Sequence, residues 1–278
     1  MSAALVSTPT GGILFSSGDI DAPYGIASLS KIWAIVLLCD RIKLLAHERK
    51  VSLDTILDES ISCAIDYEAK IYKRMDARLD LSPPDDPLTY QPFRSEKMRF
   101  RLPVENGKSY KIRDLFEAAL FQSKNDALQA LADHFFGDAD NIGFQAASKV
   151  LAHKLGLSTT KIGNPHGLCD GDNVSSAREL NAFYSFIVQE GFLGFFGRFR
   201  PAGKEHTAQS FLDDPRLAQK DIEIMLVKTA TGSDRRGNDG AESAMTIAKI
   251  DNQLRIALAL SDPNRFETLI DLLGKKSL

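Results

Sequence analysis

Apolar residues recur along this chain at two spacings, which predict where helices and strands lie. Steps of three and four predict a first helix that buries one face, with its apolar positions at Ile32, Ile35, Val36, Cys39, Ile42 and Leu45. The same spacing predicts helices at about 112–120, 127–134, 144–155 and 265–273 and, after Ser176 and Glu179, one more that ends near Gly191.

Short apolar runs bounded by turn residues predict strands between these helices. Residues 3–7 and 13–16 flank a turn that contains Gly11 and Gly12, which predicts a hairpin. Residues 221–227 predict another strand, and residues 244–250 and 254–260 predict a second hairpin across Asp251 and Asn252. The pattern is weaker from 51 to 103, where a helical stretch is expected from about Glu59 to Met75, followed by a proline-rich segment that cannot continue a helix.

The composition is that of an ordinary globular protein. It has 278 residues, of which 44% are hydrophobic and 26% charged, enough for one large or two small domains. A net charge of −3 makes nucleic acid an improbable partner and does not favour anionic lipid. The three cysteines, Cys39, Cys63 and Cys169, show no paired spacing, so they are expected to be free thiols.

The N-terminal residues carry information about the cellular compartment of the protein. Met1 is followed by no basic start, no long apolar segment and no small-residue cleavage pattern, so no signal peptide is visible. No run approaches the length of a transmembrane helix, and no amphipathic anchoring tail is seen. Three explanations stay open: a mature or truncated chain, a misassigned start, or a protein that stays inside the cell.

Ser28 and Lys31 are the first candidates for chemistry. If the first helix begins at Ser28, Lys31 projects from the same face one turn later, so its amine can reach the Ser28 hydroxyl. A lysine that is desolvated in a pocket can accept that hydroxyl proton and so activate the serine as a nucleophile. The alternative is that Ser28 is a helix N-cap and Lys31 a surface charge.

Two further boxes follow in the chain and favour the first interpretation. Ser123-Lys124-Asn125 interrupts two apolar helices, and Lys228-Thr229-Ala230 ends a predicted strand. An S-x-x-K, an S-x-N and a K-T-G box in this order are the signature of penicillin-binding proteins and class A beta-lactamases. The third box carries Ala230 where the signature has glycine.

The neighbouring residues narrow the resemblance to one family. The stretches that carry it are Ala27-Ser28-Leu29-Ser30-Lys31-Ile32, Phe121-Gln122-Ser123-Lys124-Asn125-Asp126-Ala127, Asn164-Pro165-His166-Gly167-Leu168 and Ser175-Ser176-Ala177-Arg178-Glu179-Leu180. Over nearly its whole length the chain resembles the serine D-alanyl-D-alanine carboxypeptidases, the low-molecular-weight penicillin-binding proteins of peptidase family S11.

The resemblance implies an α+β fold of the beta-lactamase and DD-peptidase type. An antiparallel sheet flanked by helices is expected, together with a mostly helical lobe. Residues 1–278 would form a single catalytic domain, with a sheet lobe at about 1–27 and 221–278 and a helical lobe at about 28–220. The 95 residues from Ser28 to Ser123 look longer than the family pattern, which predicts an insertion near 65–100. That insertion is either a solvated surface loop or a lid or docking arm.

The family also implies a role for each matched position. Ser28 is the nucleophile, Lys31 its base, and Ser123 relays a proton to the leaving amine. The substrate-binding set implied by the resemblance is Asn125, Lys228, Thr229, Ala230 and Thr231. Within this set Asn125 bonds the substrate amide, Lys228 and Thr229 hold the terminal carboxylate, and the Thr231 NH forms an oxyanion hole with the Ser28 NH. No metal or organic cofactor is required.

The implied ligands are peptidoglycan pentapeptides and beta-lactam antibiotics, and the implied location is periplasmic or extracytoplasmic. His166 is expected to hold its loop in shape by bonding the backbone rather than to act as a base. Arg178 is expected to tie its helix to the wall of the site.

Two other functions stay open. One is a beta-lactamase, although no E-x-x-L-N box is present. The other is a weakly active or inactive homologue that binds cell-wall peptide or a protein partner, which Ala230 favours, because glycine at that place lets a substrate backbone lie close to the strand.

Overall fold

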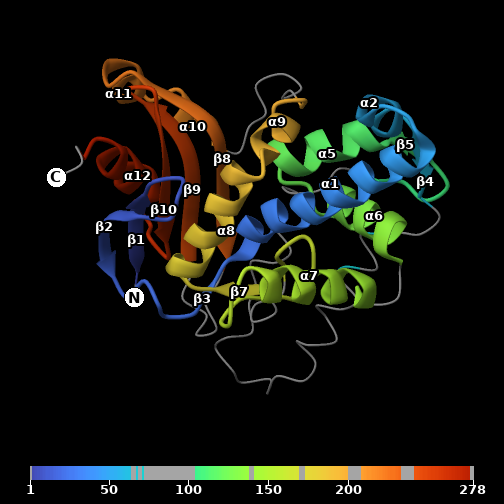
Figure 1. The fold of residues 1–278 in the computed structure, drawn as a ribbon, viewed down its shortest axis with the longest axis horizontal. Coiled ribbons are helices and arrows are strands. Elements are labelled where there is room, and N and C mark those ends of the chain that lie inside the picture. Colours follow the sequence, from blue (N-terminus) through green and yellow to red (C-terminus); the bar gives the residue numbers. More distant parts are fainter. Residues whose placement is uncertain are drawn as a thin grey trace.

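The computed structural model describes residues 2–63, 67, 71, 104–137, 141–168, 173–199, 208–232 and 241–275. These residues form an antiparallel sheet with helices on both of its faces (Figure 1). The α+β fold expected from the resemblance is therefore confirmed.

The central sheet has five strands in the order β2-β1-β10-β9-β8, and all neighbours are antiparallel. Its strands are β1 (Ala3–Ser7), β2 (Ile13–Gly18), β8 (Ile222–Gly232), β9 (Ala241–Ile250) and β10 (Gln253–Leu260). Both predicted hairpins are confirmed, since β1 pairs with β2 and β9 with β10. Asp251 and Asn252 connect the second pair with φ of 49° and 61°, the left-handed conformation of a tight hairpin turn. This order leaves β8 at one edge of the sheet.

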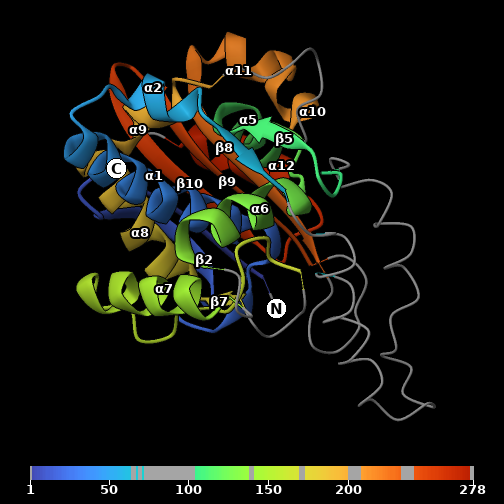
Figure 2. The same ribbon diagram turned by 90° about the vertical axis from the view of Figure 1, so that its right-hand side faces the viewer.

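The helices are divided between the two faces of this sheet (Figures 1 and 2). They are η1 (Ala27–Leu29), α1 (Ser30–Arg49), α2 (Leu53–Leu57), α5 (Ile112–Phe121), α6 (Asn125–Phe136), α7 (Ile142–Lys154), α8 (Ala177–Gln189), α9 (Phe192–Phe196), α10 (Gln209–Leu212), α11 (Pro215–Gln219) and α12 (Arg265–Leu273). Short strands lie among them: β3 (Tyr24–Gly25), β4 (Ser60–Ser62), β5 (Ser109–Lys111), β6 (Lys161–Ile162) and β7 (Asn173–Ser175).

The sheet separates two apolar cores, because successive side chains of a strand point to opposite faces. Leu5 and Leu258 pack into the core shared with α1, α5, α6, α7 and α8. Val6, Ala257 and Ala259 face the other core, which α12 covers. The small alanine side chains on this second face let α12 lie close against the sheet.

Helix α1 is buried more completely than its apolar stripe predicts. Every residue from Ser30 to Cys39 is buried, and only from Asp40 onward does one side meet solvent. The reason is its central position, since α2, α5, α6 and α7 all contact it and Trp33 lies against Phe183 of α8, with ring centroids 4.5 Å apart. The start of α1 is consequently held by protein on every side.

One element differs from its prediction. The helical stretch expected from about Glu59 is wrong at its start, because Ser60–Ser62 form β4 and pair with Ser109–Lys111 of β5. A strand needs a distant partner, which local spacing does not reveal. Tyr67 and Ile71 are helical and buried, whereas the remainder of the expected insertion and the proline-rich segment lie outside the described residues.

In the part of the chain that the structure describes, no helix combines the length and the apolar character needed to span a bilayer.

The contact between α1 and α8 generates a stability prediction. Phe183→Ala is expected to lower the free energy of unfolding by about 3–5 kcal/mol, because it leaves a cavity under Trp33. Urea unfolding followed by circular dichroism measures the change. Val150→Ala on the outer face of α7, where the side chain is 70% exposed, is the control and should stay within about 0.5 kcal/mol. Equal losses in the two variants would contradict the central role of this contact.

Candidate active site

Ser28 lies in a short turn that leads directly into α1. The turn is the 3₁₀ helix η1, and α1 follows at Ser30, so Lys31 sits in the first turn of the longer helix. The Lys31 Nζ atom is 2.8 Å from the Ser28 Oγ atom. Ser28 caps neither helix and Lys31 has no exposed surface, which excludes the alternative of a cap beside a surface charge. Helical spacing had correctly predicted that the two side chains meet.

The backbone beside Ser28 is unusual. Ala27 has a φ of 40°, a conformation that residues with a side chain seldom adopt. Its carbonyl accepts a hydrogen bond of 2.7 Å from the Ser30 hydroxyl. Backbone strain of this kind persists only where the surroundings hold it, and it occurs often at functional sites.

Ser123 and Asn125 lie at the junction of α5 and α6. Ser123 has a φ of 57°, and its Oγ atom accepts a hydrogen bond of 2.8 Å from Lys228 Nζ. Asn125 is the first residue of α6 and is 6% exposed. Its Oδ1 atom is buried without a hydrogen-bond partner. An unsatisfied buried oxygen costs about 1–3 kcal/mol, so this atom is suited to accept an N–H from a ligand.

Strand β8 carries the third box along its length. Lys228 and Ala230 are two residues apart, so they share a face of the strand, and they are 1% and 2% exposed. Thr229, on the opposite face, is also buried, and Thr231 is exposed. Because β8 is the edge strand and η1 lies against it, the third box is brought beside Ser28.

A loop between β6 and β7 completes the surroundings of Lys31. The carbonyl oxygen of His166 accepts a hydrogen bond of 2.5 Å from Lys31 Nζ. The His166 Nδ1 atom accepts one of 3.0 Å from the Leu168 NH, so the expectation that this side chain bonds its own loop is confirmed. The carbonyl contact was missed, since a backbone atom 135 residues away leaves no signal in the sequence.

Gly167 lets this loop lie directly on the turn that contains Ser28. Its φ is +83°, and a Cβ atom there would lie 2.0 Å from the Ala27 oxygen and 2.7 Å from the Ser30 hydroxyl. Both values are far below a permitted contact, so only glycine fits.

Burial lowers the pKa of both lysines. Removal from water lowers the pKa of Lys31 well below its usual value, and the nearby charge of Lys228 lowers it further. Burial likewise lowers the pKa of Lys228 to about 7. The lowered pKa suits Lys31 to act as a base, with Ser28 as the nucleophile that it activates.

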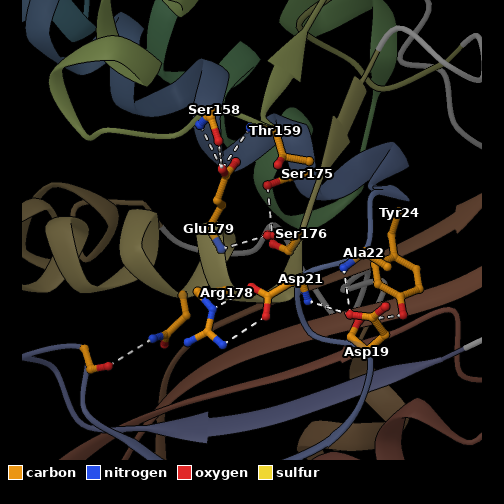
Figure 3. A network of polar contacts seen from close by, with 12 residues as sticks. Asp19, Asp21, Ala22, Tyr24, Ser158, Thr159, Ser175, Ser176, Arg178 and Glu179 are labelled. Carbon is orange, nitrogen blue, oxygen red and sulfur yellow. Dashed lines mark hydrogen bonds and ion pairs between the residues drawn. The ribbon is translucent and has the colours of Figure 1, made fainter.

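Polar contacts join the start of α8 to the neighbouring segments (Figure 3). Ser176 caps this helix, and its hydroxyl accepts a hydrogen bond of 3.2 Å from the Glu179 NH. The Glu179 carboxylate, which a capping box would direct back to Ser176, instead accepts 2.8 Å hydrogen bonds from the NH groups of Ser158 and Thr159. Burial raises the pKa of Glu179, but a hydrogen bond of 2.6 Å from the Thr160 hydroxyl, together with those NH groups, lowers it below its usual value.

Arg178 forms a second link from the same helix. Its guanidinium donates hydrogen bonds of 2.6 and 3.0 Å to the two carboxylate oxygens of Asp21 (Figure 3). Its NH also bonds the Ile20 carbonyl. Arg178 thus ties α8 to the segment that precedes β3 and, beyond it, Ser28.

Comparison with known proteins gives a consistent result. The family model described as D-alanyl-D-alanine carboxypeptidase matches residues 67–234. The D-alanyl-D-alanine carboxypeptidase DacA of Haemophilus influenzae is 33% identical over 79 residues, a stretch that covers 28% of this chain and only 20% of that relative.

Solved structures share the fold at low sequence identity. Penicillin-binding protein 6B of Escherichia coli has a TM-score of 0.67 at 22% identity, over 98% of this chain and 75% of that chain. Penicillin-binding protein 5 of Haemophilus influenzae has a TM-score of 0.65 at 17% identity, over 98% and 67%. Penicillin-binding protein D2 of Listeria monocytogenes, solved with cefotaxime bound, has a TM-score of 0.61 at 19% identity, over 98% and 93%.

The proximity of the two buried lysines generates a prediction. Lys228→Gln is expected to raise the pKa of Lys31, because the variant removes a positive charge that disfavours protonation of the Lys31 amine. The titration of Lys31 can be followed by NMR in protein labelled with ¹³C at the lysine Cε atom. Lys249→Gln on β9, where the side chain is 41% exposed, is the control and should leave the titration unchanged. A Lys31 pKa that does not rise in Lys228→Gln would refute the coupling.

Proposed function

Since this chain belongs to the D-alanyl-D-alanine carboxypeptidase family, we propose that it is a serine hydrolase that removes the terminal D-alanine from peptidoglycan stem peptides. The observation that carries the proposal is the Lys31 amine, which is buried, has a lowered pKa and lies 2.8 Å from the Ser28 hydroxyl. That arrangement is what an acyl-transfer reaction through a serine requires.

The first chemical step uses the Ser28 and Lys31 pair. The Lys31 amine takes the Ser28 proton while the Ser28 oxygen attacks the carbonyl carbon that precedes the terminal D-alanine. The NH groups of Ser28 and Thr231 stabilise the resulting oxyanion, a role supported by the position of β8 beside η1. Collapse of the intermediate breaks the peptide bond and leaves an ester on Ser28.

The proton that Lys31 took from Ser28 passes through the Ser123 hydroxyl to the leaving amine, which leaves the Lys31 amine uncharged again. The bond from Lys228 Nζ to Ser123 Oγ supports this role, because it holds the Ser123 side chain in place. Water then hydrolyses the ester, with the Lys31 amine again as the base. The buried Oδ1 atom of Asn125 accepts an N–H from the peptide and so satisfies an atom that is otherwise unpartnered.

Lys228 and Thr229 bind the carboxylate at the end of the peptide. A carboxylate next to Lys228 favours its charged form and raises its pKa above the value of about 7 in the ligand-free protein. The charge on Lys228 disfavours protonation of Lys31. Binding of the substrate therefore keeps the Lys31 base uncharged at the moment when it is needed.

Beta-lactam antibiotics are proposed as inhibitors that acylate the same serine. The Listeria monocytogenes relative has been solved with cefotaxime and with ampicillin bound, which supports this class of ligand. The proposed place of action is outside the cytoplasm, where peptidoglycan lies.

Covalent labelling tests the proposed function. Incubation with a fluorescent penicillin is expected to give one long-lived label per molecule, located on Ser28 by peptide mapping. Ser28→Ala should abolish the label, and Ser52→Ala, which changes the cap of α2 far from the site, should retain it. Absence of any adduct in the unchanged protein would exclude the proposal, and rapid loss of the adduct with hydrolysis of the drug would favour a beta-lactamase.

Ala230 permits a separate prediction about the third box. Ala230 is 2% exposed and belongs to the apolar core on the helical side of the sheet, so its methyl group is largely covered by protein. Ala230→Gly is therefore expected to lower stability by about 1–2 kcal/mol, from a lost buried methyl and a more flexible strand. The acylation rate, measured with the same penicillin, should change by less than about threefold. A large increase in that rate would show instead that the methyl obstructs the ligand.

A further inference from the structure

Asn173, the first residue of β7, uses every hydrogen-bonding atom of its side chain on one loop. It is 3% exposed. Its Oδ1 atom accepts hydrogen bonds of 2.9 Å from the Gly163 NH and 3.1 Å from the Asn164 NH, and its Nδ2 atom donates one of 2.8 Å to the Asn164 carbonyl and one of 3.5 Å to the Asn164 Oδ1 atom. The side chain therefore fixes the beginning of the loop that contains His166.

The main chain of Asn173 holds the other side of the site. Its carbonyl accepts a hydrogen bond of 3.0 Å from the NH of Ile26, which lies two residues before Ser28. The following residue, Val174, pairs with Gly25 of β3. One residue thus links the turn that carries Ser28 to the loop that contacts Lys31.

Asn164 extends this restraint to both sides of His166. Its Oδ1 atom accepts a hydrogen bond of 2.7 Å from the Gly167 NH, and its Nδ2 atom donates one of 2.7 Å to the Leu168 carbonyl. His166 lies inside the closed loop that results, and its carbonyl points at Lys31 Nζ. Movement of Asn164 would therefore move the His166 carbonyl.

The His166 carbonyl restricts the orientation of the Lys31 amine. An uncharged amine has two N–H donors and one lone pair, and a carbonyl oxygen can only accept a hydrogen bond. When one N–H of Lys31 is committed to His166, rotation about the bond from Cε to Nζ is restricted. The lone pair can then be held toward Ser28, 2.8 Å away, in the direction from which the hydroxyl proton arrives.

We propose that Asn173 is a positioning residue for acyl transfer, which through Asn164 and the His166 carbonyl aims the Lys31 lone pair at the Ser28 hydroxyl. The inference rests on the proposed function for its chemical meaning. Asn173 lies outside the three boxes, and the property that it is inferred to control is the orientation of the Lys31 amine.

Three variants test the role of Asn173. Asn173→Ala removes all four side-chain bonds, whereas Asn173→Asp can keep the two acceptor bonds and loses both donor bonds. Asn181→Ala is the matched control, because Asn181 is also 3% exposed and its side chain bonds Ser7 and the Gly11 carbonyl, away from Lys31. The control measures what the loss of a buried asparagine does by itself.

Two measurements are made on each variant. Stopped-flow acylation by a fluorescent penicillin separates the dissociation constant of the drug from the first-order acylation rate. Asn173→Ala is expected to lower that rate about 10- to 100-fold with little change in the dissociation constant, as misplacement of a reacting group does. Asn173→Asp should fall between it and the unchanged protein. Asn181→Ala should lower the melting temperature without changing the acylation rate.

The second measurement does not depend on activity. In Asn173→Ala the loop is freed and water reaches the amine, so the ¹³Cε titration of Lys31 should move toward the ordinary pKa of lysine. An unchanged titration and an acylation rate within about twofold of the unchanged protein would overturn the proposal, as would equal effects in Asn181→Ala. If the unchanged protein is not acylated, the proposed function fails, and the titration alone decides whether Asn173 positions Lys31. Should Asn173→Ala not fold, Asn173→Asp carries both measurements.

Discussion

The burial of one lysine amine is the constraint on which the rest of the site depends. A charged amine without water is costly, so burial lowers the pKa of Lys31 and requires that its amine have polar partners. Those partners are the Ser28 hydroxyl and the His166 carbonyl, which come from segments far apart in the chain. The protein must therefore bring a loop down onto the start of α1, and the contact of Gly167 with Ala27 shows how closely it does so.

The second buried amine of the site, that of Lys228, is positioned by the central sheet. Lys228 is held on the edge strand β8, its amine bonded to Ser123, and its charge opposes protonation of Lys31. In the described sheet β8 has a neighbouring strand on one side only, and η1 lies against it. Two cores, one on each face, give that strand a fixed support. The likeness of the fold to penicillin-binding proteins at 17–22% identity shows that this fold tolerates extensive sequence change.

Polar contacts also hold together the elements that surround the site. The Glu179 carboxylate holds the NH groups of Ser158 and Thr159, and Arg178 holds Asp21, so both ends of the short sheet formed by β3, β7 and β6 are attached to α8. Asn173 lies inside this sheet and connects its two outer segments. A buried and fully bonded side chain such as that of Asn173 favours one arrangement of the backbone over its alternatives.

The sequence by itself determined the features that depend on neighbouring residues. Helical spacing was enough to place Lys31 against Ser28, and turn residues were enough to predict both hairpins, because these contacts span only a few positions. Resemblance to a known family predicted that Ser123 and Lys228 belong to the same site. Only the tertiary structure decided that α1 is buried on all sides at its start, that Ser60–Ser62 form a strand, and that Glu179 bonds a distant loop. The same holds for the carbonyl of His166, because any residue supplies a carbonyl and only the folded chain determines which one meets the buried amine.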